Sequence, residues 1–426
     1  MLDIYINPDK ETQEAISRRM NIYDSAIEDR VSAILTRVRI SGDEAIFDIS
    51  EEIDGYRMES LKVSEEEYQE AEAAVSHELK TAIANAAMNI SEFHKAQRFN
   101  DVKVDTTPGV MCIQKAVPIQ NVGIYVPGGT APLFSTVLML AIPAKIAGCK
   151  YVEMCTPTGK DGKVAPAVLY TAKCCGVDAV YKIGGAQAIG AMAYGTQSVR
   201  KADKIFGPGN RYVAKAKQIV QFQGVAIDML AGPSEVLVIA DGTANPRFVA
   251  ADLLSQAEHG TDSQAMLACI SEDFAKAVKA EVDMLLKTQS RKDIVIQSLG
   301  HSSIAVFDDI SQCIDFSNAY APEHLILAVK DTWRVADKIT AAGSVFLGNY
   351  APESAGDYAS GTNHTLPTNG TAVAASGVNL DSYMHKITFQ EISKDGLSRL
   401  GKSITTMARA EGLEAHALAV DVRLDN

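Results

Sequence analysis

Asn121-Val-Gly-Ile-Tyr-Val-Pro-Gly-Gly129 opens the part of the chain in which short apolar runs alternate with helical ones. Residues 122–126 have the composition of a buried strand, residues 133–147 that of a helix, and residues 151–156 that of a second strand. The alternation continues with strand-like runs at 179–183, 204–206 and 235–240 and helical runs at 164–175, 186–194 and 210–221. Short apolar strands separated by helices predict a parallel sheet that is covered on both faces.

A second series of this kind extends from residue 235 to about residue 350, with strand-like runs at 264–270, 303–307, 324–327 and 343–347. Two series predict an α/β fold with two doubly wound, Rossmann-like parallel-sheet domains and helical extensions at both ends. We expect a helical arm at 1–25, a first domain from 26–121 with 235–375, and a second from 122–234. Residues 376–426 have little core of their own, so this helical extension is expected to pack on a partner subunit.

The N-terminal hundred residues are polar-faced and mostly helical in composition. One long helix is expected at 64–97, and a strand-like run follows at 109–117. Because His77 and His94 stand among charged residues of the long helix, both are expected on the surface.

Composition excludes several classes of protein. The net charge is −13 with no basic block, so nucleic acid is not an expected partner. The seven cysteines contain no Cys-x-x-Cys pair and are typical of reduced thiols. No basic and apolar leader opens the chain, and the apolar run at 137–146 contains Pro143 and is too short to span a bilayer. A soluble, cytoplasmic protein with no membrane partner is expected.

Three glycine-rich turns directly follow strands of the first series: Pro127-Gly-Gly129, Gly184-Gly185 and Gly207-Pro-Gly209. Glycine at the carboxyl end of a parallel strand lets backbone N–H groups approach a phosphate at a helix N-terminus. None of the three completes a Gly-x-Gly-x-x-Gly motif. The turns therefore predict either a nucleotide site or simple tight connections between strand and helix.

Asp252-Leu-Leu-Ser-Gln-Ala-Glu-His-Gly260 lies at the end of a helical run that begins after Pro246. Gln256 and His259 are three residues apart, so on a helix they share a face and could meet one metal ion. Alone, such a pair is more often a solvated helix face. Two later residues offer the missing ligands: Asp357 in a long loop at 353–367, and His416 in Glu411-Gly-Leu-Glu-Ala-His416. The four form an oxygen and nitrogen set that suits Zn²⁺, Mn²⁺ or Co²⁺.

Ala321-Pro-Glu-His324 places a carboxylate and an imidazole at the start of a strand-like run. Both residue types can be tuned for proton transfer near neutral pH. If Glu323 belongs to the loop, both side chains can project from the beginning of the strand. If the strand already includes Glu323, the two residues point to opposite faces and cannot share a site.

Several long motifs, in this order along the chain, resemble the histidinol dehydrogenase family. They are Gly123-Ile-Tyr-Val-Pro-Gly-Gly129, Gly184-Gly-Ala-Gln187, Gly207-Pro-Gly-Asn210, Asp228-Met-Leu-Ala-Gly-Pro-Ser-Glu-Val236, Asp252 to Gly260, Ala321 to His324, Gly361-Thr-Asn-His-Thr-Leu-Pro367 and Glu411 to His416. The resemblance covers roughly residues 25–425. It implies NAD-dependent oxidation of L-histidinol to L-histidine through the aldehyde, with two NAD⁺ and one Zn²⁺ per subunit of a homodimer that shares its active sites.

The resemblance also implies roles for individual residues. Glu323 and His324 match the acid/base pair, and the zinc ligands, which also contact substrate, match Gln256, His259, Asp357 and His416, the last reaching the partner subunit's site. Ser234, His324, His364 and Glu411 match further substrate contacts, and Tyr125, Gln187 and Asn210 match contacts with NAD. Two alternatives remain open from the residues: a zinc-dependent dehydrogenase of another small polyol or amino alcohol, and a catalytically silent protein that binds a metal or nucleotide.

Overall fold

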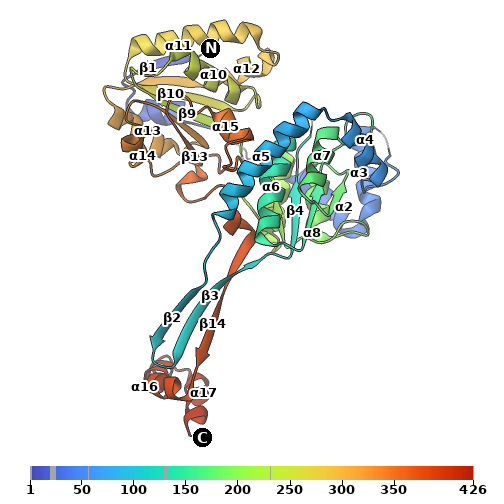
Figure 1. The fold of residues 1–426 in the computed structure, drawn as a ribbon, viewed down its shortest axis with the longest axis vertical. Coiled ribbons are helices and arrows are strands. Elements are labelled where there is room, and N and C mark those ends of the chain that lie inside the picture. Colours follow the sequence, from blue (N-terminus) through green and yellow to red (C-terminus); the bar gives the residue numbers. More distant parts are fainter. Residues whose placement is uncertain (1, 20–24, 56, 129–131, 231, 426) are drawn as a thin grey trace.

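Two parallel sheets with their helices form two lobes, and a three-stranded antiparallel ribbon extends away from both (Figure 1). The computed structural model describes residues 2–19, 25–55, 57–128, 132–230 and 232–425. Each of the two sheets is covered by helices on both faces, as the alternating sequence pattern predicts. The predicted fold of two doubly wound α/β domains with terminal extensions is therefore confirmed.

The smaller parallel sheet contains the first predicted series, in the order β6-β5-β4-β7-β8. Its strands are β4 (Asn121–Tyr125), β5 (Tyr151–Cys155), β6 (Ala179–Tyr181), β7 (Lys204–Phe206) and β8 (Ala226–Ile227). Alternate strand residues enter two separate cores. One core lies under α6 (Phe134–Ala147) and α7 (Pro166–Cys174), and the other under α8 (Gly185–Tyr194) and α9 (Arg211–Phe222).

Residues 25–95 pack on this smaller lobe, so the expectation that 26–121 join 235–375 is wrong for that segment. Its helices are α2 (Ser25–Ser41), α3 (Asp43–Asp54), α4 (Glu65–Ala74) and α5 (His77–Lys95). The apolar face of α2 packs on α8 at Gly190, where an added Cβ would lie 3.1 Å from Leu35 Cδ2. The expected single helix at 64–97 is two helices, because Ser76 accepts a hydrogen bond from Leu79 N–H and caps a new one.

The outer face of α6 is covered by α5, which explains why α6 is apolar on nearly all sides. This packing buries His94, which was expected on the surface. The ring Nδ1 lies 2.8 Å from the carbonyl oxygen of Ile90, and burial lowers the pKa of His94. Asn363 donates to the carbonyl oxygen of Met139 in α6 at 2.7 Å, so the loop that contains Asn363 is fixed against the smaller lobe.

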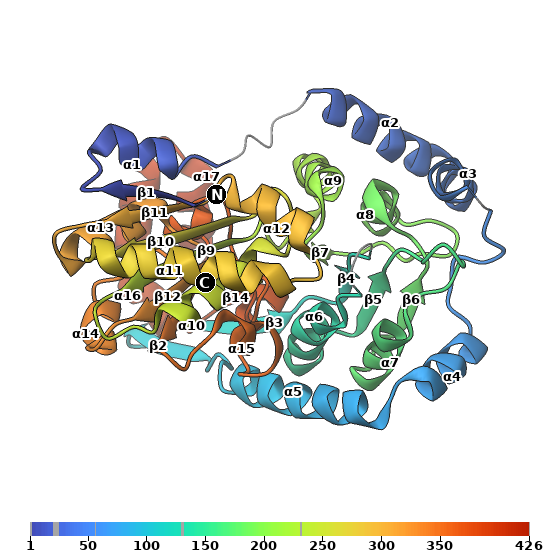
Figure 2. The same ribbon diagram turned by 90° about the horizontal axis from the view of Figure 1, so that it is seen from above.

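The larger parallel sheet has the order β1-β11-β10-β9-β12-β13. Its strands are β1 (Asp3–Ile6), β9 (Glu235–Ala240), β10 (Gln264–Cys269), β11 (Ser303–Val306), β12 (His324–Ala328) and β13 (Ser344–Leu347). Figure 2 shows the lobe from above, with β1 along its edge. Residues 1–25 are thus not only the helical arm that was expected, because residues 3–6 pair with β11 and only α1 (Lys10–Ile16) is helical before residue 19.

Helices α10 (Pro246–Ala257), α11 (Glu272–Leu285) and α12 (Lys292–Leu299) cover one face of the larger sheet. The other face packs against α1, α13 (Ile310–Tyr320) and α14 (Thr332–Ala336). The apolar residues of each strand divide between these two cores.

The ribbon consists of β2 (Val102–Thr107), β3 (Val110–Pro118) and β14 (Met384–Ile392). At its far end lie α16 (Lys394–Ala410) and α17 (Glu414–Leu424), well away from both lobes (Figure 1). The expectation of a purely helical extension at 376–426 missed β14, whose nine residues are stabilised as a strand by pairing with β3 over 110–118. Every helix among the described residues is too short or too polar to cross a membrane.

Candidate active site

The predicted acid/base pair, Glu323 and His324, lies at the amino end of β12. Ala321 adopts a left-handed conformation with φ of 49° and ends α13, so Pro322 and Glu323 precede the strand. Because Glu323 is outside the strand, its carboxylate and the His324 ring approach each other, with Nδ1 3.6 Å from Oε2. The N–H of Glu235, the first residue of β9, donates to the same carboxylate at 2.8 Å. Of the two arrangements considered for this pair, the structure has the one in which they can share a site.

The surroundings of His324 determine how its ring carries protons. Nδ1 lies 3.2 Å from the carbonyl oxygen of Glu235, which can only accept, so Nδ1 carries a proton. Nε2 is buried, has no hydrogen-bond partner among the described residues, and lies 3.6 Å from Oδ1 of Asp357. Burial lowers the pKa of His324, but the carboxylates of Glu353, Glu323 and Asp357 outweigh it and raise the pKa to about 10.

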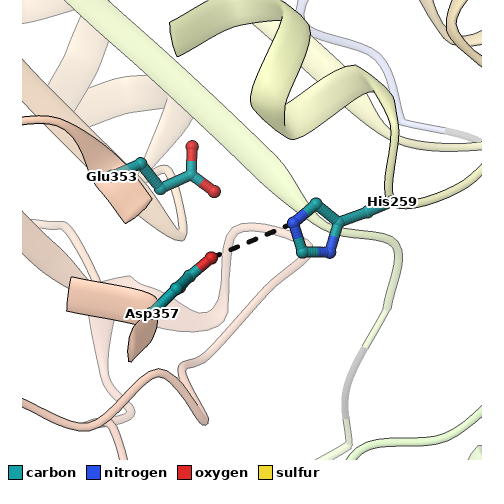
Figure 3. A group of neighbouring side chains, drawn as sticks. All are labelled: His259, Glu353 and Asp357. Atoms are coloured by element: carbon teal, nitrogen blue, oxygen red, sulfur yellow. Dashed lines mark ion pairs between the residues drawn. The ribbon is translucent and has the colours of Figure 1, made fainter. Parts of the chain in front are cut away.

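A group of three potential metal ligands lies beside His324 (Figure 3). His259, Glu353 and Asp357 offer ligand atoms that all lie within 4.8 Å of one another, and His259 Nε2 is 3.9 Å from Asp357 Oδ2. His259 comes from the segment after α10, and the two carboxylates come from α15 (Glu353–Tyr358). Burial raises the pKa of Glu353 to about 8, against the opposing effect of His324.

Two local structures differ from the sequence-based expectations. Helix α10 ends at Ala257, so Gln256 is in its last turn and His259 lies just beyond it, linked by an N–H to the Gln256 carbonyl at 3.3 Å. The expected loop at 353–367 begins with α15, which Pro352 precedes. Glu353, absent from the predicted site, faces the same way as Asp357 because the two are four residues apart on this helix. The spacing of four residues between Glu353 and Asp357 was the sequence signal that could have identified Glu353 as a site residue.

The amide of Gln256 contacts the same group. In the orientation that satisfies both of its ends, its nitrogen donates to the Glu353 carboxylate and its Oε1 accepts from the Glu235 N–H at 3.1 Å. Gln256 is fully buried. Gln256, His259 and Asp357 are therefore brought together as predicted from their types.

The predicted substrate residues fall into two sets. His364 joins the two lobes, with Nδ1 2.9 Å from the carbonyl oxygen of Asp357 and Nε2 3.3 Å from Oγ1 of Thr136 in α6. Ser234 is half-buried immediately before β9. In contrast, Glu411 and His416 are exposed at the turn between α16 and α17, at the far end of the ribbon (Figure 1). Within one chain they do not reach the group in Figure 3.

The predicted nucleotide residues surround the carboxyl edge of the smaller sheet. Tyr125 ends β4 and its hydroxyl accepts from the Gly185 N–H at 3.1 Å, Gln187 is buried in the first turn of α8, and Asn210 caps α9 by accepting from Tyr212 N–H at 3.0 Å. Gly129, in the first glycine turn, lies outside the described residues.

A cavity of about 680 Å³ opens beside these residues, at the ends of β4 and β5. Pro127, Gly128 and Thr156 line its floor, and α4 and α7 form its walls. Tyr125, Gln187 and Asn210 do not line this cavity.

Comparisons with known proteins agree with the geometry. The model of the histidinol dehydrogenase family matches residues 17–424. The chain belongs to the histidinol dehydrogenase family. It is 56% identical to a histidinol dehydrogenase of Bacteroides fragilis over 98% of both chains, and 53% identical to one of Bacteroides thetaiotaomicron over 100% of this chain and 99% of that one. The crystal structure of histidinol dehydrogenase from Elizabethkingia anophelis has a TM-score of 0.97 at 52% identity and covers 100% of this chain and 98% of that chain.

Membership of the family confirms the resemblance stated from the motifs and makes the chain a dehydrogenase, an oxidoreductase of histidine biosynthesis. All seven cysteines lie among the described residues and are free. Four of them, Cys149, Cys155, Cys269 and Cys313, are buried, and burial raises the pKa of each thiol. None of these four is suited to act as a nucleophile.

Proposed function

We propose that the enzyme catalyses the four-electron oxidation of L-histidinol to L-histidine through L-histidinal, with two NAD⁺, in the cytoplasm. One observation carries the proposal: the buried His324 has a free Nε2 beside a group of carboxylate, amide and imidazole ligands. That arrangement supplies a base and a cation site within reach of one alcohol. Family membership supports histidinol as the alcohol.

The residues present fit a zinc ion, one per subunit. Gln256, His259 and Asp357 would hold it together with His416 of the partner subunit, an oxygen and nitrogen set without thiolate. The carboxylates of Glu353 and Asp357 lie beside the imidazole of His259, and a divalent cation would balance their negative charge. Bound there, zinc supplies a Lewis acid that polarises the hydroxyl of the amino alcohol and orients it.

The chain's own side chains carry the protons. A divalent cation beside Glu353 and Asp357 would offset the carboxylates that raise the pKa of His324, and would leave Nε2 unprotonated. His324 Nε2 then accepts the hydroxyl proton while the carbon-bound hydrogen leaves as hydride. NAD⁺ supplies the hydride acceptor at each of the two oxidations. Glu323, held by the Glu235 N–H, accepts a proton from water as the water adds to the aldehyde. The resulting hydrate anion then loses a second hydride and one proton, which yields the carboxylate.

Substrate and dinucleotide would be bound from the two lobes. Ser234 and His364 contact the substrate from within the chain, and Glu411 of the partner subunit supplies negative charge for the cationic amine. Tyr125, Gln187 and Asn210 contact NAD at the carboxyl edge of the smaller sheet. The cavity at the ends of β4 and β5 has room for the adenosine half.

Apolar side chains on the ribbon and its terminal helices support a homodimer with shared active sites. Val104, Phe389, Met407 and Leu418 are all exposed in the single chain, at 49%, 44%, 66% and 59%. An exposed apolar surface of this kind on a projecting element is typical of an interface between subunits. A second copy that covers it would bring residues 411–416 to the partner's ligand group.

Measurement of NADH formed per histidinol consumed tests the proposal. We expect two NADH per histidinol with the zinc-loaded enzyme. One NADH would indicate that oxidation stops at the aldehyde. No NADH from histidinol but turnover of another amino alcohol or polyol would favour the related dehydrogenase. No turnover of any alcohol, with metal and NADH still bound, would favour the silent binding protein.

A further inference from the structure

Two buried charged side chains hold the peptide groups of Gly207, at the turn between β7 and α9. Gly207 has φ of +124°, and a Cβ there would lie 2.0 Å from the carbonyl oxygen of Tyr125. The turn therefore rests directly on the end of β4, and no other residue type can take this position. Asp228 accepts from the Gly207 N–H at 2.8 Å, and Lys217 Nζ donates to the Gly207 carbonyl at 2.9 Å.

Lys217 and Asp228 also bind each other. Lys217 Nζ donates to Oδ1 of Asp228, and this oxygen also accepts from the Met229 N–H at 2.6 Å. The side chains are only 2% and 1% exposed. A buried ion pair seldom adds stability over apolar residues of the same volume, because both charges must be desolvated. Its contacts with both polar groups of one residue indicate that it fixes a backbone conformation.

We propose that Lys217 and Asp228 are positioning residues that hold the turn at 207–210 in the conformation that receives the dinucleotide. This rests on the proposed use of NAD. The sheet order places β4 and β7 side by side, with β5 and β8 on their outer sides, so the turn lies where the connections diverge. Ligands of doubly wound sheets bind at that point. A turn fixed before binding spares the cofactor the ordering of loose backbone.

The same pair connects the dinucleotide turn to the active site. Asp228 begins the segment 228–234, which leads directly to Ser234 and to β9. The N–H of Gly232 in this segment donates to Oγ1 of Thr368, in the larger lobe. The position of Asp228 therefore sets the turn at 207–210 relative to the residues that face the substrate.

The test uses the full-length, zinc-loaded enzyme and two variants, Lys217→Met and the charge-neutral Lys217→Met/Asp228→Asn. NADH affinity is measured by fluorescence titration, KM for NAD⁺ and for histidinol by steady-state kinetics, and stability by thermal unfolding. We expect NADH affinity to fall roughly 10-fold or more in both variants, because the Gly207 carbonyl loses its buried donor. The KM for NAD⁺ rises with it, while the KM for histidinol changes little.

The double variant separates positioning from folding. It removes the buried Asp228 charge that Lys217→Met leaves unpaired, so its melting temperature should be higher than that of the single variant, while its NADH affinity should stay low. The matched control is Lys145→Met/Asp178→Asn. Lys145 Nζ donates to the Asp178 carboxylate at 2.6 Å, and the same carboxylate accepts from the Val152 N–H near the amino end of β5. This pair does not contact the turn at 207–210, so NADH affinity should be unchanged.

A folded double variant with wild-type NADH affinity overturns the proposal, as does a control pair that loses as much affinity. A wild-type enzyme that binds no NADH instead overturns the proposed function and this inference with it. Equal rises in both KM values would show a general structural role and would also refute positioning of the dinucleotide turn.

Discussion

Glu153→Gln should change how the stability of the smaller lobe depends on pH. Glu153 lies in the middle of β5 and is 1% exposed. Its Oε2 accepts only a long hydrogen bond, 3.3 Å, from the Arg200 N–H, and Oε1 has no partner among the described residues. Burial raises the pKa of Glu153 from 4.5 to about 8, against the smaller opposing effect of Arg200.

The sign and size follow from the raised pKa. Below pH 4.5 the carboxyl is protonated in both states, and its effect on stability is fully favourable. Between pH 4.5 and 8 the unfolded chain releases the proton while the folded chain retains it, so stability falls as pH rises and becomes constant above about 8. At about 1.4 kcal/mol per pKa unit, the full loss is on the order of 5 kcal/mol. Glutamine resembles the protonated acid and removes this dependence.

Thermal unfolding of wild-type and Glu153→Gln enzyme from pH 5 to pH 9 measures the effect. The variant should gain little at pH 5 and progressively more up to pH 8, where the full effect corresponds to about 10–20 °C, given about 2–4 °C per kcal/mol for domains of this size. Glu92→Gln, at a side chain 70% exposed, is the control and should show no such trend. A difference in melting temperature between wild type and Glu153→Gln that stays the same from pH 5 to pH 9 would refute the reasoning.

Three further outcomes test the proposed site. His324→Asn and Glu323→Gln should each lower turnover roughly 10²- to 10⁴-fold while metal analysis shows zinc retained, and loss of zinc would contradict an acid/base role. Glu353→Gln should weaken zinc binding about 10- to 100-fold in a chelator competition, because Glu353 holds the Gln256 amide; unchanged affinity would exclude that role. Mixing inactive His416→Asn with inactive His259→Asn subunits should restore activity, since mixed dimers contain one intact site, and persistent inactivity would count against shared sites.

Much of the fold could be predicted because period and composition are local properties. Short apolar strands between helices identified both parallel sheets, and the predicted runs at 264–270 and 324–327 correspond to β10 and β12. The assignment of residues 25–95 to a lobe was beyond such reasoning. The pattern of an amphipathic helix indicates that one face is buried, but not against which sheet. Only tertiary contacts decide this, such as those of α2 with α8 at Gly190 and of α4 with α7.

The predicted strand-like run at 109–117 corresponds to β3, but β14 of the same ribbon was missed, for a related reason. Nearly all residues of β14 are exposed in the single chain, on both faces of the strand. It therefore lacks the alternation of buried and exposed residues that is typical of a half-buried strand. Its stability comes from pairing with β3, a segment more than 260 residues earlier in the chain. Pairing at such a separation leaves no signal in either segment alone.

The site itself could be predicted only as far as residue types and spacing allowed. Gln256, His259 and Asp357 were predicted as ligands because oxygen and nitrogen donors within motifs are conspicuous, and their role stays a prediction. Glu353 was missed because its place in the site depends on α15, and the sequence from 353 to 367 was interpreted as loop. The surface assignment of His94 failed because charged neighbours on a helix describe only the exposed face, while the His94 ring is buried beside Asn363.

The connection between the lobes explains why the dinucleotide and proton-transfer residues belong to one chain. Strand β8 ends at the carboxyl edge of the smaller sheet, and β9 begins at the amino edge of the larger one. Residues 228–234 join them, a segment that spans at most about 25 Å when extended. The glycine turns and the Glu323–His324 pair must therefore lie near each other whether or not a second subunit is present. The ribbon has the opposite effect, because it carries Glu411 and His416 away from both lobes. In the proposed mechanism, cofactor binding and proton transfer are thus properties of the single fold, whereas completion of the proposed metal and substrate site requires a second subunit.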